Sequence, residues 1–190
     1  MEIFNTDSSY SNSYKDVGSF LYKNLINIFN SNREIIFLCI GTDRCTGDSL
    51  GPLVGYKIKN SSLNLSKYNI YVYGTLENPV HSKNIVDITN KIYSTFTNPY
   101  VIAIDSCLGK IPNIGHIFIN NTPLYPGLAL NKDLPPIGDL SVTGIVNMSG
   151  NYEFLVLQNT RLYTVMNLAD CISNGILLFI NNVIKEFNIK

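Results

Sequence analysis

The sequence predicts an α/β protein in which a mainly parallel sheet is layered between helices. Two observations lead to this fold class. Apolar runs without polar alternation occur at 35–40 and 100–105, as in parallel strands that are covered on both faces. Between such runs lie segments whose apolar residues recur at helical spacing. Strands that alternate with helices along a chain form layered α/β sheets.

Each expected element follows from a local pattern of this kind. The expected strands cover 35–40, 69–75, 100–105, 114–120 and 141–148. The expected helices cover 14–30, a segment from about Ser49, 82–96 and 162–184. Pro52 falls in the first turn of the second helix, where proline is tolerated. The long connection at 121–140 contains four prolines, and we expect it to be functional or mobile, as long loops in compact domains tend to be.

The composition and charge of the chain limit the kinds of protein and partner that are expected. The 190 residues, 45% hydrophobic and 15% charged, suit a polar N-terminal tail over 1–13 and a single α/β domain over 14–190. A formal net charge of zero without a basic stretch argues against a nucleic-acid partner. The late apolar segment GILLFINNVI is too short and too interrupted by asparagine to span a membrane. The four scattered cysteines fit a reducing compartment, so a cytoplasmic protein is expected.

The turn GTDRCTGDSLG, at 41–51, is glycine-rich like the turns that bind phosphate in many α/β proteins. A Walker loop, however, needs the pattern GxxxxGK[ST]. Here five residues separate Gly41 from Gly47, and Asp48 stands where the lysine would be. A carboxylate at a helix N-terminus occupies the positive end of the helix dipole and repels phosphate. Nucleotide binding at this turn is therefore not expected.

Two aspartates follow strands that we expect to be neighbours. Asp48 comes soon after the strand 35–40, and Asp105 ends the strand 100–105. In doubly wound sheets of order 2-1-3-4-5, strands one and three are adjacent and the chain leaves them in opposite directions, which opens a ligand crevice. We assume this order for the five expected strands. Because adjacent strands are about 4.8 Å apart, the two carboxylates are then expected to converge.

Converging carboxylates have two principal uses. They can share a proton, so that one activates a water molecule as general base while the other acts as an acid. They can also ligate a divalent cation. Either use suits hydrolysis. Taken alone, Asp48 is more simply explained as the N-cap of the following helix, and it is Asp105 that argues for a site.

The residues around these aspartates carry a resemblance to a known family. Four segments resemble, in this order, the motifs of the spore protease YyaC family: CIGTDRCTGDSLGPLVG (39–55), YGTLENPVH (73–81), VIAIDSCLG (101–109) and VLQNTRLYTVMNLAD (156–170). That family is similar to the germination protease of spores and, more distantly, to hydrogenase maturation endopeptidases. The resemblance implies a three-layer αβα sandwich with a mainly parallel, doubly wound sheet, of the phosphorylase/hydrolase-like type.

The resemblance also implies an activity. The germination protease is an atypical aspartic-type peptidase that uses two aspartates, and Asp48 and Asp105 match their positions by motif. A sporulation-associated endopeptidase is therefore expected, with a protein or peptide substrate, such as a spore protein, and with no required cofactor. Two alternatives stay open: a metal-binding peptidase of the maturation type, and a non-catalytic sporulation protein that retains the pocket.

Four further residues are candidates at the same site. Arg44, Thr46 and Ser49 lie in the same turn as Asp48 and are candidate substrate-binding residues. His81, just past the strand 69–75, is the candidate third ligand beside the two aspartates if the site holds a divalent metal ion. An ion pair is the more ordinary role for the arginine, and a loop position without chemistry is the more ordinary one for the histidine.

Overall fold

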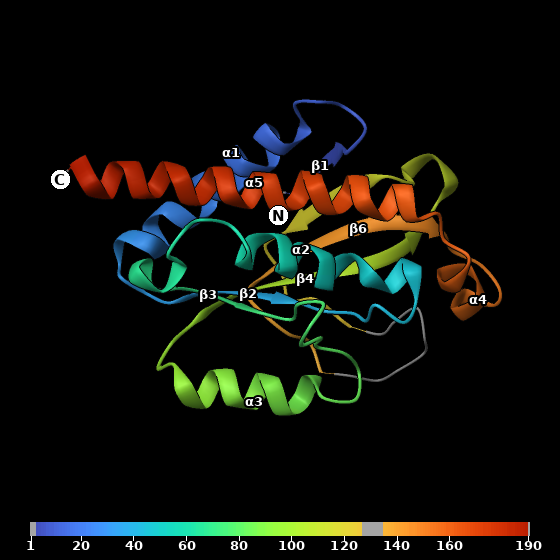
Figure 1. Cartoon of the computed structure of the whole chain (residues 1–190), viewed down its shortest axis with the longest axis horizontal. Coiled ribbons are helices and arrows are strands. Elements are labelled where there is room, and N and C mark those ends of the chain that lie inside the picture. The colour runs from blue at the N-terminus through green and yellow to red at the C-terminus, as the bar shows by residue number, and fades with distance from the viewer. Residues whose placement is uncertain (1–2, 127–134, 190) are drawn as a thin grey trace.

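A computed structural model of the chain describes residues 3–126 and 135–189. Within these residues, six strands form one sheet with helices on both of its faces (Figure 1). The strands are β1 (Ile3–Asp7), β2 (Ile35–Cys39), β3 (Ile70–Tyr73), β4 (Tyr100–Gly109), β5 (His116–Asn120) and β6 (Leu140–Met148). The α-helices are α1 (Ser13–Asn30), α2 (Leu50–Lys59), α3 (Ile85–Thr95), α4 (Glu153–Gln158) and α5 (Leu162–Ile189). Three short 3-10 helices are η1 (Thr46–Ser49), η2 (Leu65–Tyr68) and η3 (Ile111–Asn113).

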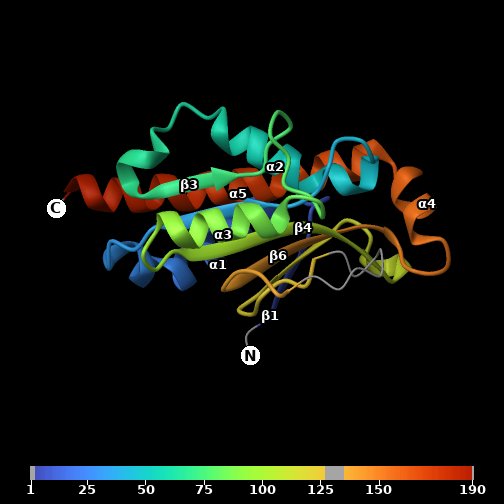
Figure 2. The same ribbon diagram turned by 90° about the horizontal axis from the view of Figure 1, so that it is seen from below.

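The sheet lies between two helical layers. Helices α1, α2 and α5 cover one face and α3 covers the other, as Figures 1 and 2 show. Strand β2 illustrates how the two cores share the sheet: Ile35, Phe37 and Cys39 pack with the first layer, whereas Ile36 and Leu38 pack with α3. All five side chains are fully buried, which explains a run without polar alternation. The predicted three-layer αβα sandwich is confirmed.

The strand order is β1-β5-β6-β4-β2-β3. The predicted arrangement is therefore confirmed for three strands. Strand 35–40 lies in the middle and is parallel to both of its neighbours, 69–75 and 100–105. The other two expected strands are exchanged: 141–148 pairs with 100–105, and 114–120 lies beyond it and runs antiparallel. The short η3 connection between β4 and β5 explains the reversal, because a parallel crossover needs a dozen or more residues.

The polar N-terminal tail expected over 1–13 is not found in its described part. Residues Ile3–Asp7 form β1, which pairs antiparallel with β5, from Ile3 opposite Asn120 to Asp7 opposite His116. The Phe4 ring lies 4.9 Å from the Phe20 ring of α1. The sheet therefore continues by one edge strand beyond the expected domain boundary.

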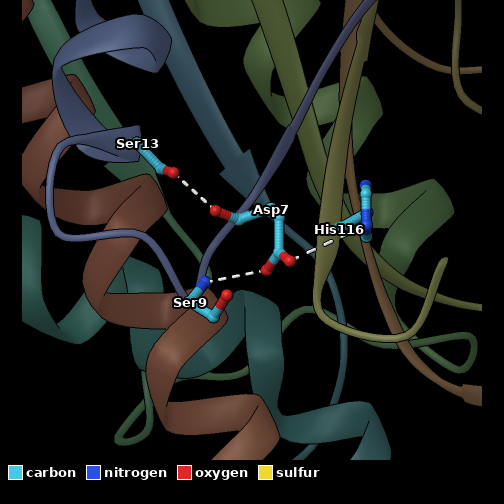
Figure 3. A network of polar contacts seen from close by, with 4 residues as sticks. All are labelled: Asp7, Ser9, Ser13 and His116. Carbon is cyan, nitrogen blue, oxygen red and sulfur yellow. Dashed lines mark hydrogen bonds and ion pairs between the residues drawn. The ribbon is translucent and has the colours of Figure 1, made fainter. Parts of the chain in front are cut away.

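Asp7 fixes the turn between β1 and α1 (Figure 3). Its Oδ1 accepts a hydrogen bond of 2.9 Å from the Ser9 amide, and its carbonyl oxygen accepts one from the Ser13 hydroxyl. Its Oδ2 lies 3.9 Å from Nε2 of His116 on the neighbouring strand. These groups connect the edge strand, the turn and the first helix, although a partly exposed ion pair of this kind contributes little stability.

Helix α5 is the longest element of the domain and runs beside α1 (Figure 1). Among the described residues, its stretch Leu162–Glu186 is long and apolar enough to cross a membrane by length and composition alone, which the sequence reasoning did not anticipate. In this fold, 56% of its most apolar window is buried, and Val165, Ile172 and Phe179 are fully buried in the core. Its apolar character is explained by core packing.

The long connection that we expected at 121–140 is described only at its two ends. Leu124 and Ile137 form an isolated antiparallel bridge and are buried in the core on the α3 side. Residues 127–134, in the middle of the expected loop, lie outside the described residues.

Candidate functional site

The glycine-rich turn brings the start of α2 against the end of β2. Gly41 has φ +137°, and a Cβ there would lie 2.0 Å from the Asp48 carbonyl oxygen. A Cβ on Gly51 would lie 2.1 Å from the Ile40 carbonyl oxygen. Real Cβ atoms do not approach this closely, so both positions require glycine. The glycines therefore serve close backbone packing, which fixes η1 and with it Asp48.

Asp48 is not a helix N-cap, although that was the simpler explanation of this residue when it was considered without Asp105. The N-cap positions of η1 and α2 are occupied by Cys45 and Ser49. Asp48 itself lies inside η1, where its amide donates a 3.0 Å bond to the Cys45 carbonyl and its carbonyl accepts a 2.9 Å bond from the Thr42 amide. Its half-buried side chain lines a cavity.

Asp105 reaches the same cavity because β2 ends before β4 does. The two strands pair only as far as Cys39 opposite Ile104, and the Ile40 amide still bonds to the Ile104 carbonyl at 2.7 Å. Asp105 is the next residue. Strand β4 does not end there, as the sequence suggested, but continues to Gly109 along β6. The aspartate thus sits within a strand whose neighbour on one side has stopped.

The cavity has a volume of about 260 Å³ and lies where β2 ends beside β4. Four of the predicted site residues line it: Asp48, Asp105, His81 and Arg44. The predicted pairing of the strands 35–40 and 100–105, which are β2 and β4, therefore brings the two carboxylates together. A crevice at this point of the sheet is the common ligand site of doubly wound folds.

Two of the predicted substrate-binding residues are placed elsewhere. Thr46 and Ser49 are not among the residues that line the cavity. Ser49 is buried, and its hydroxyl donates a 2.7 Å hydrogen bond to the Thr46 carbonyl within η1. Their polar groups stabilise the turn that carries Asp48, because residues three apart in a helical turn lie on the same face.

The charge of Asp48 affects the protonation of Asp105. The pKa of Asp105 is raised well above its usual value, first by burial and second by the negative charge of Asp48. The Ser106 amide, which donates a 2.7 Å bond to Asp105 Oδ1, opposes this rise but does not cancel it. Burial disfavours a charged carboxylate, and a second carboxylate nearby disfavours it further. Asp105 is thus held in its protonated form over a wider pH range than an ordinary aspartate, because its pKa is raised.

His81 lines the cavity but is oriented by its own loop. Its Nδ1 accepts a 3.3 Å bond from the Lys83 amide, and its backbone amide donates a 2.8 Å bond to Asn84 Oδ1. Within residues 3–126 and 135–189, no three His, Cys, Asp or Glu side chains are close enough together to hold a metal ion. The predicted ligand set of two aspartates and His81 is therefore not assembled, although all three residues face one cavity.

Two cysteines lie near the acids, and neither is a ready nucleophile. Burial is the main factor that raises the pKa of the Cys45 thiol. Burial also raises the pKa of Cys107, and the charge of Asp105 adds to the effect. A thiol needs a lowered pKa to react as a thiolate, so thiol chemistry does not suit this site.

Sequence reasoning missed the apolar and basic residues that complete the cavity. Phe154 and Leu157 come from α4, which lies beside η1 (Figure 1). Six residues are too few to show helical periodicity, so the sequence did not predict this helix, although Leu157 falls in the motif at 156–170. Pro126 comes from the proline-rich connection, for which a functional role was expected, and Lys83 follows the predicted His81.

Comparison with known proteins identifies the family. A family model described as "Protein of unknown function (DUF1256)" matches residues 5–175. The chain belongs to the DUF1256 family. This DUF1256 protein is also similar to "Uncharacterized protein YyaC" of Bacillus subtilis (strain 168), with 50% identity over 148 residues, which cover 78% of this chain and 70% of the relative. The expected relation to YyaC is confirmed, whereas the relation to peptidases rests on the motifs alone.

Proposed function

We propose that this protein is an endopeptidase of the aspartic type, which hydrolyses a peptide bond with a water molecule activated between Asp48 and Asp105. The observation that carries the proposal is the pairing of these acids in one cavity, where the charge of one raises the pKa of the other. A carboxyl group whose pKa is raised by burial and by a neighbouring carboxylate is typical of general acid–base sites. The motif resemblance to spore proteases supports the same reaction class.

The raised pKa of Asp105 suits it to the role of general acid, which leaves the role of general base to Asp48. Ionised Asp48 accepts a proton from the water, whose oxygen attacks the carbonyl carbon of the scissile bond. Protonated Asp105 gives its proton to the carbonyl oxygen, which yields a tetrahedral intermediate without net charge. When the intermediate collapses, the C–N bond breaks, the leaving amine takes the proton from Asp48, and Asp105 regains its own. The products are a carboxylic acid and an amine, and both aspartates return to their initial states.

The proposed substrate class rests on the reaction and on the motif resemblance. A peptide bond in a protein or peptide is the bond that this chemistry cleaves, and the resemblance to spore proteases makes a spore protein in the cytoplasm of the sporulating cell the proposed substrate. Arg44, at the cavity, is proposed to donate hydrogen bonds to the substrate. The mechanism requires no cofactor.

The test is to incubate the purified protein with a spore extract and to map new peptide termini by mass spectrometry. Asp48→Asn and Asp105→Asn are each expected to slow cleavage at least about 100-fold, because each removes one proton-transfer group. Asp43→Asn is the matched control: Asp43 lies in the same turn, is exposed and does not line the cavity. Wild-type cleavage rates in either of the first two variants would overturn the proposal.

The same samples decide between this mechanism and its two alternatives. A maturation-type site would bind a divalent ion at the two aspartates and His81, so calorimetric titration with Zn²⁺ would give heat in the wild type and less in Asp48→Ala. Identical null curves would discard the metal. A non-catalytic protein would release no new termini at any pH and would instead retain a stable protein partner on purification.

A further inference from the structure

The cavity that contains the two acids also has an apolar wall. Five apolar residues line it: Ile40, Ile85, Pro126, Phe154 and Leu157. Four of them are buried and belong to the packed interior. Phe154 differs, because 53% of it is exposed to solvent while it still faces the cavity. A large aromatic side chain in this position gains by covering another apolar group, since apolar area removed from water is stabilising.

Phe154 is held at a fixed place relative to the acids. Its helix, α4, is anchored by Leu157, which packs so tightly on Gly47 of η1 that a Cβ on this glycine would lie 2.8 Å from the leucine side chain. The Asn147 amide group of β6 donates bonds of 3.2 Å to the Val156 carbonyl and 3.3 Å to the Thr160 hydroxyl. These contacts tie α4 to η1, which carries Asp48, and to β6.

The helical spacing separates a cavity-facing side of α4 from an outer side. Residues three apart lie on the same face of a helix, and Phe154 and Leu157 both line the cavity. Leu155 is 52% exposed, almost the same as Phe154, but does not line the cavity. Two adjacent apolar residues of equal exposure thus differ in whether they can meet a bound molecule.

We propose that Phe154 and Leu157 form an apolar subsite that binds an aliphatic or aromatic side chain of a polypeptide substrate beside the scissile bond, and that Phe154 determines this specificity. The inference rests on the proposed function. Because the subsite belongs to the same cavity as the acids, a chain whose peptide bond reaches the acids places a neighbouring side chain against this wall. A polar or charged side chain there would lose hydration without gaining partners from Phe154 or Leu157.

The experiment digests a peptide library, prepared from a denatured proteome, with the wild type, Phe154→Ala and Leu155→Ala, and sequences the new termini. The wild type is expected to enrich aliphatic and aromatic residues at one fixed position beside the cut. Phe154→Ala loses this enrichment, and its kcat/KM for a peptide with leucine there falls about tenfold or more, mainly through KM. Leu155→Ala behaves like the wild type. Because both substituted side chains are exposed, unchanged melting temperatures verify that the variants fold.

The outcomes separate this inference from the proposed function. If the wild type cleaves without a preference for apolar residues, or if Phe154→Ala keeps this preference, the proposed subsite is wrong, whereas the proposed peptidase activity is still supported. If no peptide is cleaved, the peptidase fails, and the subsite is then judged by calorimetry with two capped hexapeptides that differ only by a central leucine or serine. The leucine peptide is expected to bind the wild type and Leu155→Ala at least about tenfold more tightly than Phe154→Ala. Equal affinities for the three proteins overturn the inference.

Discussion

The carboxyl group of Asp105 lies where water scarcely reaches it, and its ionisation therefore opposes folding. The folded protein binds the proton of this acid more tightly than the unfolded chain does, because burial and the charge of Asp48 raise the pKa of the folded state. By linkage, binding of this proton contributes to the free energy of unfolding. The contribution is fully present below the pKa that Asp105 has in the unfolded chain, and it is lost as the pH rises through the pKa that Asp105 has in the folded protein. A residue that destabilises its own fold at neutral pH is typical of a functional site.

Asp105→Asn is expected to be more stable than the wild type at pH 7, with a difference that shrinks as the pH falls toward the ordinary value of 3.8. The asparagine cannot ionise, and its side-chain oxygen can still accept the hydrogen bond from the Ser106 amide. Urea unfolding at a series of pH values measures the difference. A variant that is less stable at pH 7, or a difference independent of pH, would contradict the pKa shift.

At the scale of elements, the connection from β2 through η1 to α2 determines where Asp48 lies. Its geometry depends on backbones that approach each other more closely than any side chain allows, as at Gly41 and Gly51. The strand end, the turn and the helix start therefore form one rigid unit, which is suited to holding a catalytic group in place.

Gly41→Ala is expected to destabilise the protein by about 1–3 kcal/mol or more, because alanine is strained at positive φ and its Cβ would collide with the Asp48 carbonyl oxygen. Relief of the collision moves η1, so cleavage is expected to fall even at temperatures where the variant is folded. Gly150→Ala is the control, since a Cβ there meets nothing within 4 Å. Thermal unfolding and the cleavage assay, run side by side, measure both effects; equal behaviour of the two variants would contradict the close packing.

Across the whole molecule, the site and the edge strand β1 are separated. Strands β5 and β6 lie between β1 and β4, which carries Asp105. Contacts within a packed fold are stabilising wherever they occur, but only the contacts near Asp48 and Asp105 hold these two side chains in position.

Deletion of residues 1–7 is expected to lower stability while leaving cleavage intact at low temperature. The deletion removes the five residue pairs between β1 and β5, each worth about 0.2–1 kcal/mol, together with the Phe4–Phe20 contact. Denaturant unfolding measures the first effect, and kcat/KM at 10 °C measures the second. Loss of cleavage in a shortened protein that remains folded would show that the edge strand influences the cavity.

The sequence indicated the buried centre of the fold more clearly than its margins. The run Ile35–Cys39 is apolar throughout because both of its faces are covered, and such a strand is recognisable without a structure. The edge strand Ile3–Asp7 is short and mostly polar, and its position depends on pairing with β5, more than one hundred residues later. Local patterns do not contain information on a partner so distant.

The same distinction applies to the candidate site. The position of Asp48 and Asp105 in one cavity could be predicted because each lies next to a recognisable apolar run, and the adjacency of the two strands is a recurrent feature of doubly wound sheets. Phe154 belongs to a six-residue helix that is set in place by Gly47 and Asn147, so its proximity to the acids arises only from tertiary packing. Thr46 and Ser49 show the reverse error, since nearness in sequence to Asp48 did not bring them to the cavity.

The walls of the cavity come from stretches of chain that are far apart in sequence, from Ile40 to Leu157. These stretches meet only in the native state, so a molecule that occupies the cavity binds the native state alone. Such a molecule raises the melting temperature by mass action, with about 2.7 kcal/mol of added stability at one hundred times its dissociation constant. A thermal-shift screen of peptides against the Asp105→Asn protein would therefore detect occupants without any need for turnover.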